Sequence, residues 1–149
     1  MKVSKLVFIL TLIIVLAGVS AYAQNCNVKF EDVVKKQIGG YCTANDWVID
    51  NQTDLLGFWK QVYATMIPQP ECPTVDFDNY VVIVTAMGQE NNSCYNTEII
   101  CIEDDGNGNY TVYVDDTYPQ PGDQCQQVMV CPVHAVIAAA PSGTVTFQH

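Results

Sequence analysis

The chain has 149 residues, and its 16 acidic residues, six lysines and absence of arginine give a formal net charge of −10 at pH 7. Nucleic acids and anionic membranes attract positively charged proteins, so a chain this acidic is a poor partner for either. We therefore expect no nucleic-acid partner.

The first 23 residues have the features of a secretory signal peptide. Two lysines precede an apolar run at residues 6–19, and Ala21 and Ala23 place small side chains where a signal peptidase recognises them. Cleavage there would leave Gln24 first, and the apolar run is shorter than the roughly 20 residues of a membrane span. We predict an exported protein, periplasmic or extracellular, with a single domain at 24–149 and no membrane insertion after cleavage.

The first part of this domain predicts two short strands followed by a helix. Residues 27–50 carry strand-like apolar positions on both sides of the chain-breaking pair Gly39-Gly40. Polar residues from Asn51 onwards supply capping side chains ahead of apolar residues at i, i+3, i+4 and i+7 spacing. The spacing predicts an amphipathic helix near residues 53–66 whose aromatic side chains, Trp59 among them, pack against a sheet.

The remainder of the chain predicts strands and turns. Residues 80–87 are continuously apolar and β-branched, which is typical of a central strand buried on both faces. Residues 95–102 and an alternating strand from Tyr110 flank Gly106-Asn107-Gly108-Asn109, a strong hairpin signal. Residues 128–140 predict one long strand or two, and residues 144–147 a closing strand. The expected fold class is α+β: a mainly antiparallel, sandwich-like sheet with one helix.

The cysteine pattern is typical of disulfides and not of a metal site. Disulfides are the default outside the cytoplasm, and an odd number of cysteines leaves at least one thiol free. We predict three disulfides with Cys26–Cys42 as the N-terminal bridge, and the sequence leaves the pairing of the other cysteines open. Zinc binding would need paired short spacings, so we expect no metal. The seven candidates are Cys26, Cys42, Cys72, Cys94, Cys101, Cys125 and Cys131.

Five short motifs follow one another along residues 28–148. They are Trp47-Val48-Ile49-Asp50-Asn51, Phe58-Trp59-Lys60-Gln61-Val62, Pro73-Thr74-Val75-Asp76-Phe77-Asp78, Met87-Gly88, and Cys131-Pro132-Val133-His134-Ala135-Val136-Ile137. In this order they resemble the PrcB-type family of exported proteins, whose founding members are protease-complex stability subunits. The resemblance implies a non-enzymatic accessory protein that binds and stabilises a secreted or surface subtilisin-like protease, or another envelope protein. It implies neither a catalytic residue nor a cofactor.

The loop that follows residues 80–87 departs from the family pattern. Family members carry a Gly-x-x-Pro-Thr/Ser-Gly-Gly-Tyr turn, whereas this chain has Gly88-Gln89-Glu90-Asn91-Asn92-Ser93-Cys94-Tyr95. Asparagine tolerates the positive φ that glycine would supply, and we expect a disulfide at Cys94 to fix the loop. The candidate partner-binding residues are Gln89, Asn91, Asn92 and Tyr95, with Tyr113 and Tyr118 as candidate neighbours.

Two functions of other classes stay open as alternatives. One is a small protease inhibitor acting through residues 89–95, because the usual family turn is similar to the tyrosine-containing loop of chagasin-type inhibitors. The other is a stand-alone structural surface domain with no dedicated partner. Inhibition of a protease in an assay would distinguish the first from the second.

Catalytic chemistry has one candidate pair, Cys131 and His134, a potential nucleophile and base. Three residues apart on a strand, their side chains point to opposite faces, so we expect a disulfide for Cys131 and structural hydrogen bonds for His134. The carboxylates of residues 103–109 lack the spacing of a calcium loop and predict a solvated hairpin tip. We expect His149 to lie at a frayed end. The sequence thus predicts no catalytic residue, no enzyme activity and no cofactor.

Overall fold

The computed structural model describes residues 25–149, and the predicted signal peptide at 1–23 lies outside the described residues. In chain order the elements are β1 (Phe30–Lys36), β2 (Asn45–Ile49), α1 (Gln52–Val62), β3 (Tyr80–Ala86), β4 (Asn96–Asp104), β5 (Tyr110–Thr117), β6 (Val133–Ala139) and β7 (Val145–Gln148). Among the described residues, no helix is long and apolar enough to cross a membrane.

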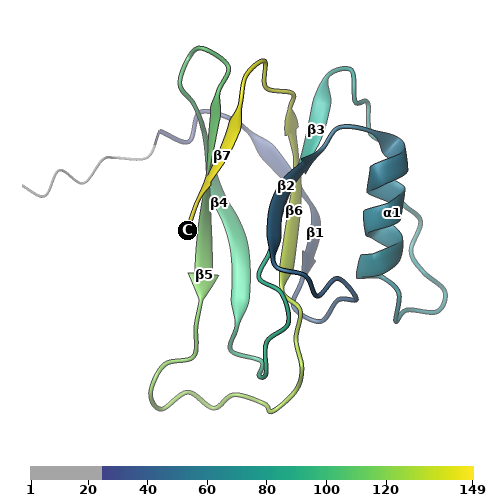
Figure 1. Ribbon diagram of the computed structural model, residues 1–149, viewed down its shortest axis with the longest axis vertical. Coiled ribbons are helices and arrows are strands. Elements are labelled where there is room, and N and C mark those ends of the chain that lie inside the picture. The colour runs from purple at the N-terminus through teal and green to yellow at the C-terminus, as the bar shows by residue number, and fades with distance from the viewer. Residues whose placement is uncertain (1–24) are drawn as a thin grey trace, which may run out of the picture.

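The strands form two facing sheets. A four-stranded sheet has the order β1-β6-β3-β2, and a three-stranded sheet has the order β4-β5-β7. Only the β5–β7 pair is parallel among these strand pairs, and the others are antiparallel. Helix α1 covers the outer face of the four-stranded sheet, which gives three layers (Figure 1). The predicted α+β class, with a mainly antiparallel sheet and one helix, is confirmed.

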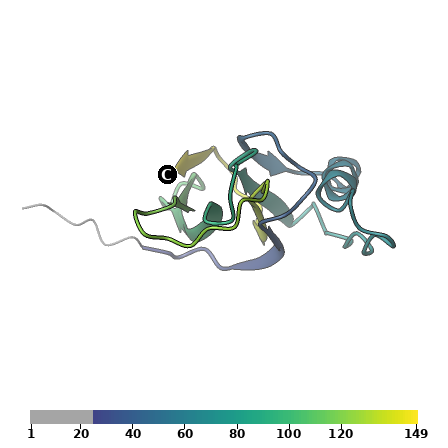
Figure 2. The same ribbon diagram turned by 90° about the horizontal axis from the view of Figure 1, so that it is seen from below.

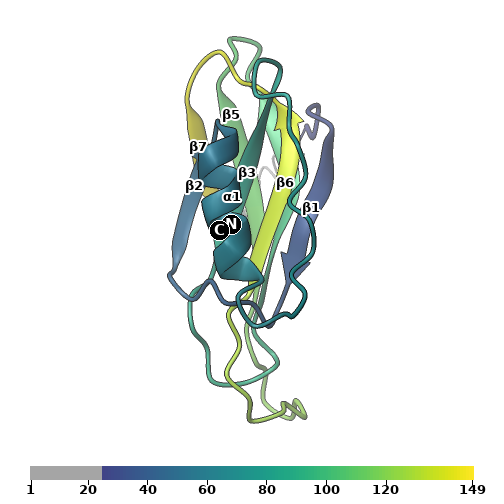
Figure 3. The same cartoon turned by 90° about the vertical axis from the view of Figure 1, so that its right-hand side faces the viewer.

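Two apolar cores lie on the two faces of the four-stranded sheet, and Figure 3 shows α1 in front of this sheet. Successive residues of a strand point to opposite faces, so β3 contributes its even-numbered residues to one core and its odd-numbered residues to the other. The core beneath α1 includes Leu55, Phe58, Trp59, Val62, Val82 and Val84. The core between the sheets includes Val81, Ile83, Ile99, Ile102, Val112 and Val136. The predicted central strand, buried on both faces, is confirmed.

Hydrogen bonds from outside the helix decide where α1 begins and ends. Asn51 is the N-cap, and its side-chain oxygen accepts a 2.9 Å hydrogen bond from the backbone N–H of Asp54. At the other end, the backbone N–H of Gly40 donates a 3.0 Å hydrogen bond to the carbonyl of Val62. Only glycine allows this approach, because a Cβ at residue 40 would collide with the helix backbone. Since this bond engages its last carbonyl, the helix ends at Val62, four residues before the predicted end.

The predicted hairpin between β4 and β5 is confirmed. Gly106 and Gly108 have positive φ angles of 83° and 82°, which glycine adopts without strain. The side chain of Asp104 accepts a 2.8 Å hydrogen bond from the backbone N–H of Gly106, and Asp105 accepts one of 2.9 Å from the side-chain amide of Asn109. The hydrogen bond from the Asn109 side chain, together with those from neighbouring backbone N–H groups, lowers the pKa of Asp105. The carboxylates therefore serve the turn itself.

Three disulfides form, and Cys72 is a free thiol, so the predicted number is confirmed. The predicted Cys26–Cys42 bridge is wrong. Strand β1 lies between these two cysteines, and its seven extended residues span roughly 23 Å at about 3.3 Å per residue. A disulfide needs Cα atoms within about 7 Å, so the strand carries the two cysteines too far apart. The pairs are Cys26–Cys101, Cys42–Cys131 and Cys94–Cys125.

The strand order of the four-stranded sheet differs from the order of these strands in the chain. β1 and β2 follow one another in sequence but form opposite edges of their sheet, with β6 and β3 between them. The predicted segment 128–140 contains one strand, β6, which begins only at Val133. Residues before it belong to a long connection in which Val130 makes an isolated antiparallel bridge with Glu90. That connection forms part of the candidate site.

Candidate functional site

Three connections meet at one end of the sandwich. Residues 37–44 join β1 to β2, residues 87–95 join β3 to β4, and residues 118–132 join β5 to β6. We call these three segments together the loop end. Figure 1 shows it below the strands, and Figure 2 looks at it from below. It contains the predicted partner-binding segment 89–95.

Two of the three disulfides lie in the loop end. Cys42 of the first segment is bonded to Cys131 of the third, with a Cα–Cα distance of 4.9 Å. Cys94 of the second segment is bonded to Cys125 of the third, at 5.4 Å. The third segment is thus covalently attached to both of the others, so the three loops form one cross-linked unit. The predicted disulfide at Cys94 is confirmed.

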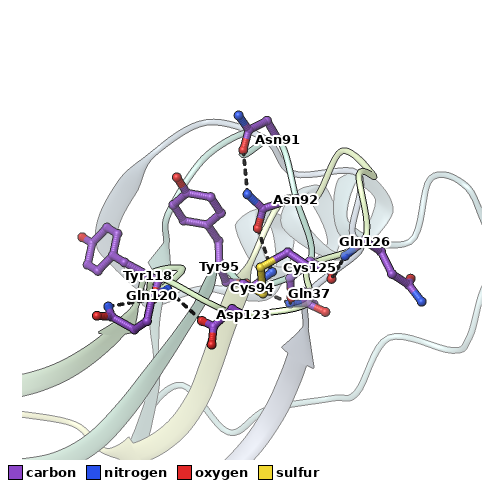
Figure 4. Close-up of a disulfide and its surroundings, with 11 residues drawn as sticks. Gln37, Asn91, Asn92, Cys94, Tyr95, Tyr118, Gln120, Asp123, Cys125 and Gln126 are labelled. Atoms are coloured by element: carbon purple, nitrogen blue, oxygen red, sulfur yellow. Dashed lines mark hydrogen bonds between the residues drawn. A yellow bond between two sulfur atoms is a disulfide. The ribbon is translucent and has the colours of Figure 1, made fainter.

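Hydrogen bonds strengthen the same unit (Figure 4). The backbone N–H of Ser93 donates to the carbonyl of Gln126 at 3.0 Å, and the N–H of Gln126 donates back to the Ser93 hydroxyl at 2.9 Å. The side-chain amide of Gln37 donates to the backbone carbonyls of Ser93 and Tyr95, at 2.5 Å and 2.9 Å. Gln37 therefore links the first segment to the second, where no disulfide does.

The loop end carries fewer charged residues than the rest of the protein. Glu90 and Asp123 are the only charged residues among its 32, whereas 18 of the other 93 residues between 25 and 149 are charged. Its exposed apolar side chains include Tyr118 at 53 % and Met129 at 54 %. Its exposed amides are Gln89, Asn91, Gln120, Gln124, Gln126 and Gln127. Depletion of charge, with exposed aromatic and methionine side chains, is typical of the centre of a protein interface.

The predicted binding residues divide into an outer and an inner pair. Gln89 and Asn91 are exposed, whereas Asn92 and Tyr95 are half-buried. The side-chain oxygen of Asn92 accepts a 3.0 Å hydrogen bond from the backbone N–H of Cys94, so Asn92 shapes the turn. The Tyr95 ring packs edge-on against Tyr118, with ring centroids 6.1 Å apart. The structure brings these two tyrosines together, and Figure 4 shows them side by side.

Tyr113, the other candidate neighbour, does not join this group. It lies within β5, where its hydroxyl donates a 3.0 Å hydrogen bond to Glu103 of the neighbouring strand. Five residues of extended chain, roughly 17 Å, separate it from Tyr118. The half-buried ring therefore belongs to the surface of the three-stranded sheet, away from the loop end.

A row of polar side chains crosses the four-stranded sheet next to the loop end. Lys35, His134, Thr85 and Asp46 are successive register partners across the four-stranded sheet, each one residue from the end of its strand. Three of them contact β4 of the facing sheet: Lys35 pairs with Glu98, the His134 ring binds the Ile99 N–H, and Thr85 lies against Thr97. The fourth, Asp46, binds His149, which follows β7. This polar row separates the apolar core from the disulfide-linked loops.

His134 is a structural residue of this row, as predicted. Its side chain is fully buried, and its Nδ1 accepts a 2.8 Å hydrogen bond from the backbone N–H of Ile99. The ring proton must then lie on Nε2, which donates to Asp32 at 3.0 Å. Burial lowers the pKa of His134, and the partly exposed Asp32 does not offset it. Cys131 is bonded to Cys42, so these two side chains do not form a nucleophile–base pair.

We expect His134 to make the protein less stable as pH falls from 7 to 5. Below pH about 6.5 the unfolded chain binds a proton at this residue, whereas the folded chain stays neutral down to its lower pKa. The free energy of unfolding should fall by up to about 1.4 kcal/mol per pH unit in that window. Urea denaturation of a His149→Gln variant would measure it, because this background removes the other histidine. The double variant, with His134→Gln and His149→Gln, is the control. If the free energy of unfolding of His149→Gln were as independent of pH over this range as that of the double variant, the assignment would be contradicted.

His149 does not lie at a frayed end, and that expectation is wrong. Its Nε2 contacts Asp46 of β2 at 2.8 Å, and its Nδ1 contacts Asp116 of β5 at 2.7 Å. The ring therefore bridges the edge strand of one sheet and a strand of the other. A charged partner on each side was not visible in the sequence, because residues 46, 116 and 149 are far apart along the chain.

One group of side chains in the loop end has the composition of a metal site. Cys94, Asp123 and Cys125 place their sulfur and carboxylate atoms close together. The two sulfurs are joined in a disulfide, so neither is a thiolate that could bind a metal ion. The free thiol, Cys72, lies away from this group in the connection between α1 and β3, and burial raises its pKa.

The sequence pointed to Tyr118 but not to the rest of the third segment, residues 118–132, as part of the site. Its cysteine pairing could not be inferred from one chain. The signal that was present is the low charge shared by all three loops. Comparison of the chain with models of protein families, with curated proteins and with solved structures found no match. The PrcB-type resemblance thus stays a prediction from the motifs.

Proposed function

We propose that this protein is a non-enzymatic binding or accessory module that works outside the cytoplasm and holds a partner protein through its loop end. The observation that carries this proposal is the covalent linkage of three charge-poor loops, with Tyr118 and Met129 exposed on them. Ordering flexible loops on binding costs conformational entropy, and loops that are already cross-linked avoid much of that cost.

The chemistry of the loop end supports a protein partner. Tyrosine offers a large contact area at a low entropic cost, and asparagine and glutamine offer adaptable hydrogen bonds. Tyr118 is held beside Tyr95, so its ring is partly ordered before any partner arrives. The side-chain amide of Gln120 donates a 3.2 Å hydrogen bond to the Tyr118 carbonyl, so a polar group adjoins this tyrosine pair, as at the rim of an interface.

Two lines of support bear on the location and the partner. Three intramolecular disulfides are typical of an oxidising compartment, and the predicted signal peptide agrees with export. The motif resemblance to the PrcB-type family favours a secreted subtilisin-like protease, or another envelope protein, as the partner. We propose that binding stabilises this protease complex.

The test compares two tyrosines with similar exposure at opposite ends of the molecule. Tyr118, 53 % exposed, lies in the loop end, and Tyr80, 45 % exposed, begins β3 at the other end. The tagged mature protein would first capture its partner from native envelope and medium, and the purified pair would then be measured by calorimetry. We expect Tyr118→Ala to weaken binding at least about tenfold, as the loss of a central tyrosine does, and Tyr80→Ala to leave it unchanged.

Each other outcome speaks against the proposal. Equal binding by both variants would place the interface elsewhere. If the captured protein is a protease whose activity falls on binding, the module is an inhibitor, which was the alternative for residues 89–95. Robust turnover by the isolated protein on a panel of hydrolase substrates would contradict the non-enzymatic assignment.

A further inference from the structure

His149 lies between one acidic residue from each sheet. Its Nε2 is 2.8 Å from an oxygen of Asp46 on β2, the edge strand of the four-stranded sheet. Its Nδ1 is 2.7 Å from an oxygen of Asp116 on β5. Since the residue follows β7 directly, the ring closes the side of the sandwich where β2 and β7 are the edge strands.

Both contacts require the ring to donate a hydrogen. An ionised carboxylate only accepts hydrogen bonds, and a neutral imidazole carries a single N–H. A ring that serves two carboxylates at once must therefore be the doubly protonated imidazolium. Loss of one proton would set a nitrogen lone pair against a carboxylate oxygen at hydrogen-bond distance, which is repulsive. The geometry around His149 thus depends on its protonation state.

The surroundings increase this dependence. Within residues 25–149, Asp116 Oδ1 is buried and has no hydrogen-bond partner, so its carboxylate relies on the donors that reach Oδ2. Those donors are the His149 ring and, more weakly at 3.5 Å, the hydroxyl of Tyr118. Glu90 is a further acidic residue that lines, with Asp46, Asp116, Tyr118 and His149, a hollow of about 530 Å³. The charged and titratable groups around His149 are therefore three carboxylates and one tyrosine.

We propose that His149 is a pH-controlled latch between the two sheets, closed when both ring nitrogens carry a proton and released when one proton is lost. In the closed state the ring holds Asp46 and Asp116 together. Release leaves these two carboxylates facing each other without a cation between them, which loosens β7 from the side of the sandwich. It also moves one lining residue of the hollow beside the loop end, where Tyr118 stays as the remaining donor to Asp116.

The direction of the pH dependence follows from the same contacts. Burial on its own would lower the pKa of His149, but the hydrogen bonds and charges of Asp46 and Asp116 outweigh it and raise the pKa. The latch is therefore fully closed below the pKa of the released ring, about 6.5, and weakens as pH rises through the higher pKa of the closed ring. His134 has the opposite shift, because it is buried with its Nδ1 bound to a backbone N–H.

The first test is a titration of the ring nitrogens by NMR, with ¹⁵N-labelled protein from pH 5 to 9. We expect His149 to titrate above 6.5, with protons on both Nδ1 and Nε2 below its midpoint. The midpoint should move downward in D46N and in D116N, while that of His134 stays unchanged in both. Asp46 is the more exposed of the two, so D46N keeps the test available if D116N does not fold.

The second test measures hydrogen exchange of the β7 amides, residues 145–148, over the same pH range. We expect their protection factors, corrected for intrinsic exchange, to fall by up to about tenfold per pH unit as the latch opens, and to lose this pH dependence in H149Q. A His149 midpoint at or below 6.5, or one unmoved by D46N and D116N, would overturn the proposal. So would an identical pH dependence of β7 protection in H149Q. Neither test needs the partner, so the latch can fail while the proposed function holds.

Discussion

Replacing Trp59 by alanine is expected to lower the free energy of unfolding by about 3–5 kcal/mol, the usual cost of removing a large buried aromatic side chain. The side chain is only 7 % exposed in the core beneath α1. Its ring packs on Tyr63 with centroids 4.6 Å apart, and its indole N–H donates a 2.9 Å hydrogen bond to the carbonyl of Pro70. Alanine would leave both a cavity and an unpaired carbonyl.

The matched control lies on the same helix. Leu56 is 40 % exposed, so Leu56→Ala should cost less than about 1 kcal/mol. Urea denaturation followed by circular dichroism measures both variants. A loss below about 1 kcal/mol for Trp59→Ala would show that α1 does not pack on the four-stranded sheet through this face.

Removing the Cys42–Cys131 disulfide, by replacing both residues with alanine, is expected to cost about 2–5 kcal/mol. The bond closes a loop of the chain with a sequence separation of 89, against 31 for Cys94–Cys125. Longer closed loops restrict the unfolded chain more, so the first pair should contribute more than the second in the chain-entropy account. Denaturation of the two double variants compares them directly.

Cys72→Ala is the control for this comparison. Cys72 is a free thiol, so its loss removes no cross-link and should change stability by less than about 1 kcal/mol. If Cys72→Ala were as damaging as the double variant, or if the Cys42→Ala and Cys131→Ala double variant kept full stability, the disulfide assignment would be contradicted.

The elements that were predictable from sequence are those with a strong local period. β3 is continuously apolar because both of its faces are covered, and α1 has the spacing of a helix with one buried face. The β4–β5 hairpin depends on glycines with positive φ, and the glycine-asparagine motif in the local sequence predicts such a turn. Each of these signals arises within about a dozen residues. The end of α1 was less predictable, because it depends on Gly40, a residue outside the helix.

Features that depend on distant pairings were not predictable. The sequence places Cys26 and Cys42 close together along the chain, but β1 between them sends them to different ends. His149 looked like a terminal residue without partners, because nothing local marks Asp46 or Asp116 as its neighbours. His134, in contrast, was correctly predicted as structural, because side chains three residues apart on a strand point to opposite faces, which argued against a pairing with Cys131.

The candidate site was predicted in part. Residues 89–95 lie in the loop end and Cys94 forms a disulfide there, as expected. The tyrosine pair was only half anticipated, since Tyr118 belongs to the loop end and Tyr113 does not. Tyr118 was the only member of residues 118–132 named as a candidate neighbour, and the Cys42–Cys131 pairing, which joins this segment to residues 37–44, was left open by the sequence.

The measurement that tests the central proposal most directly is a hydrogen-exchange footprint of the protein with its captured partner. We expect slowed exchange in the complex at residues 87–95 and 118–132, with no change at the exposed face of α1 or at the 105–109 hairpin. Slowed exchange confined to α1 or to the hairpin, with the loop end unchanged, would contradict the proposal that these cross-linked loops hold the partner.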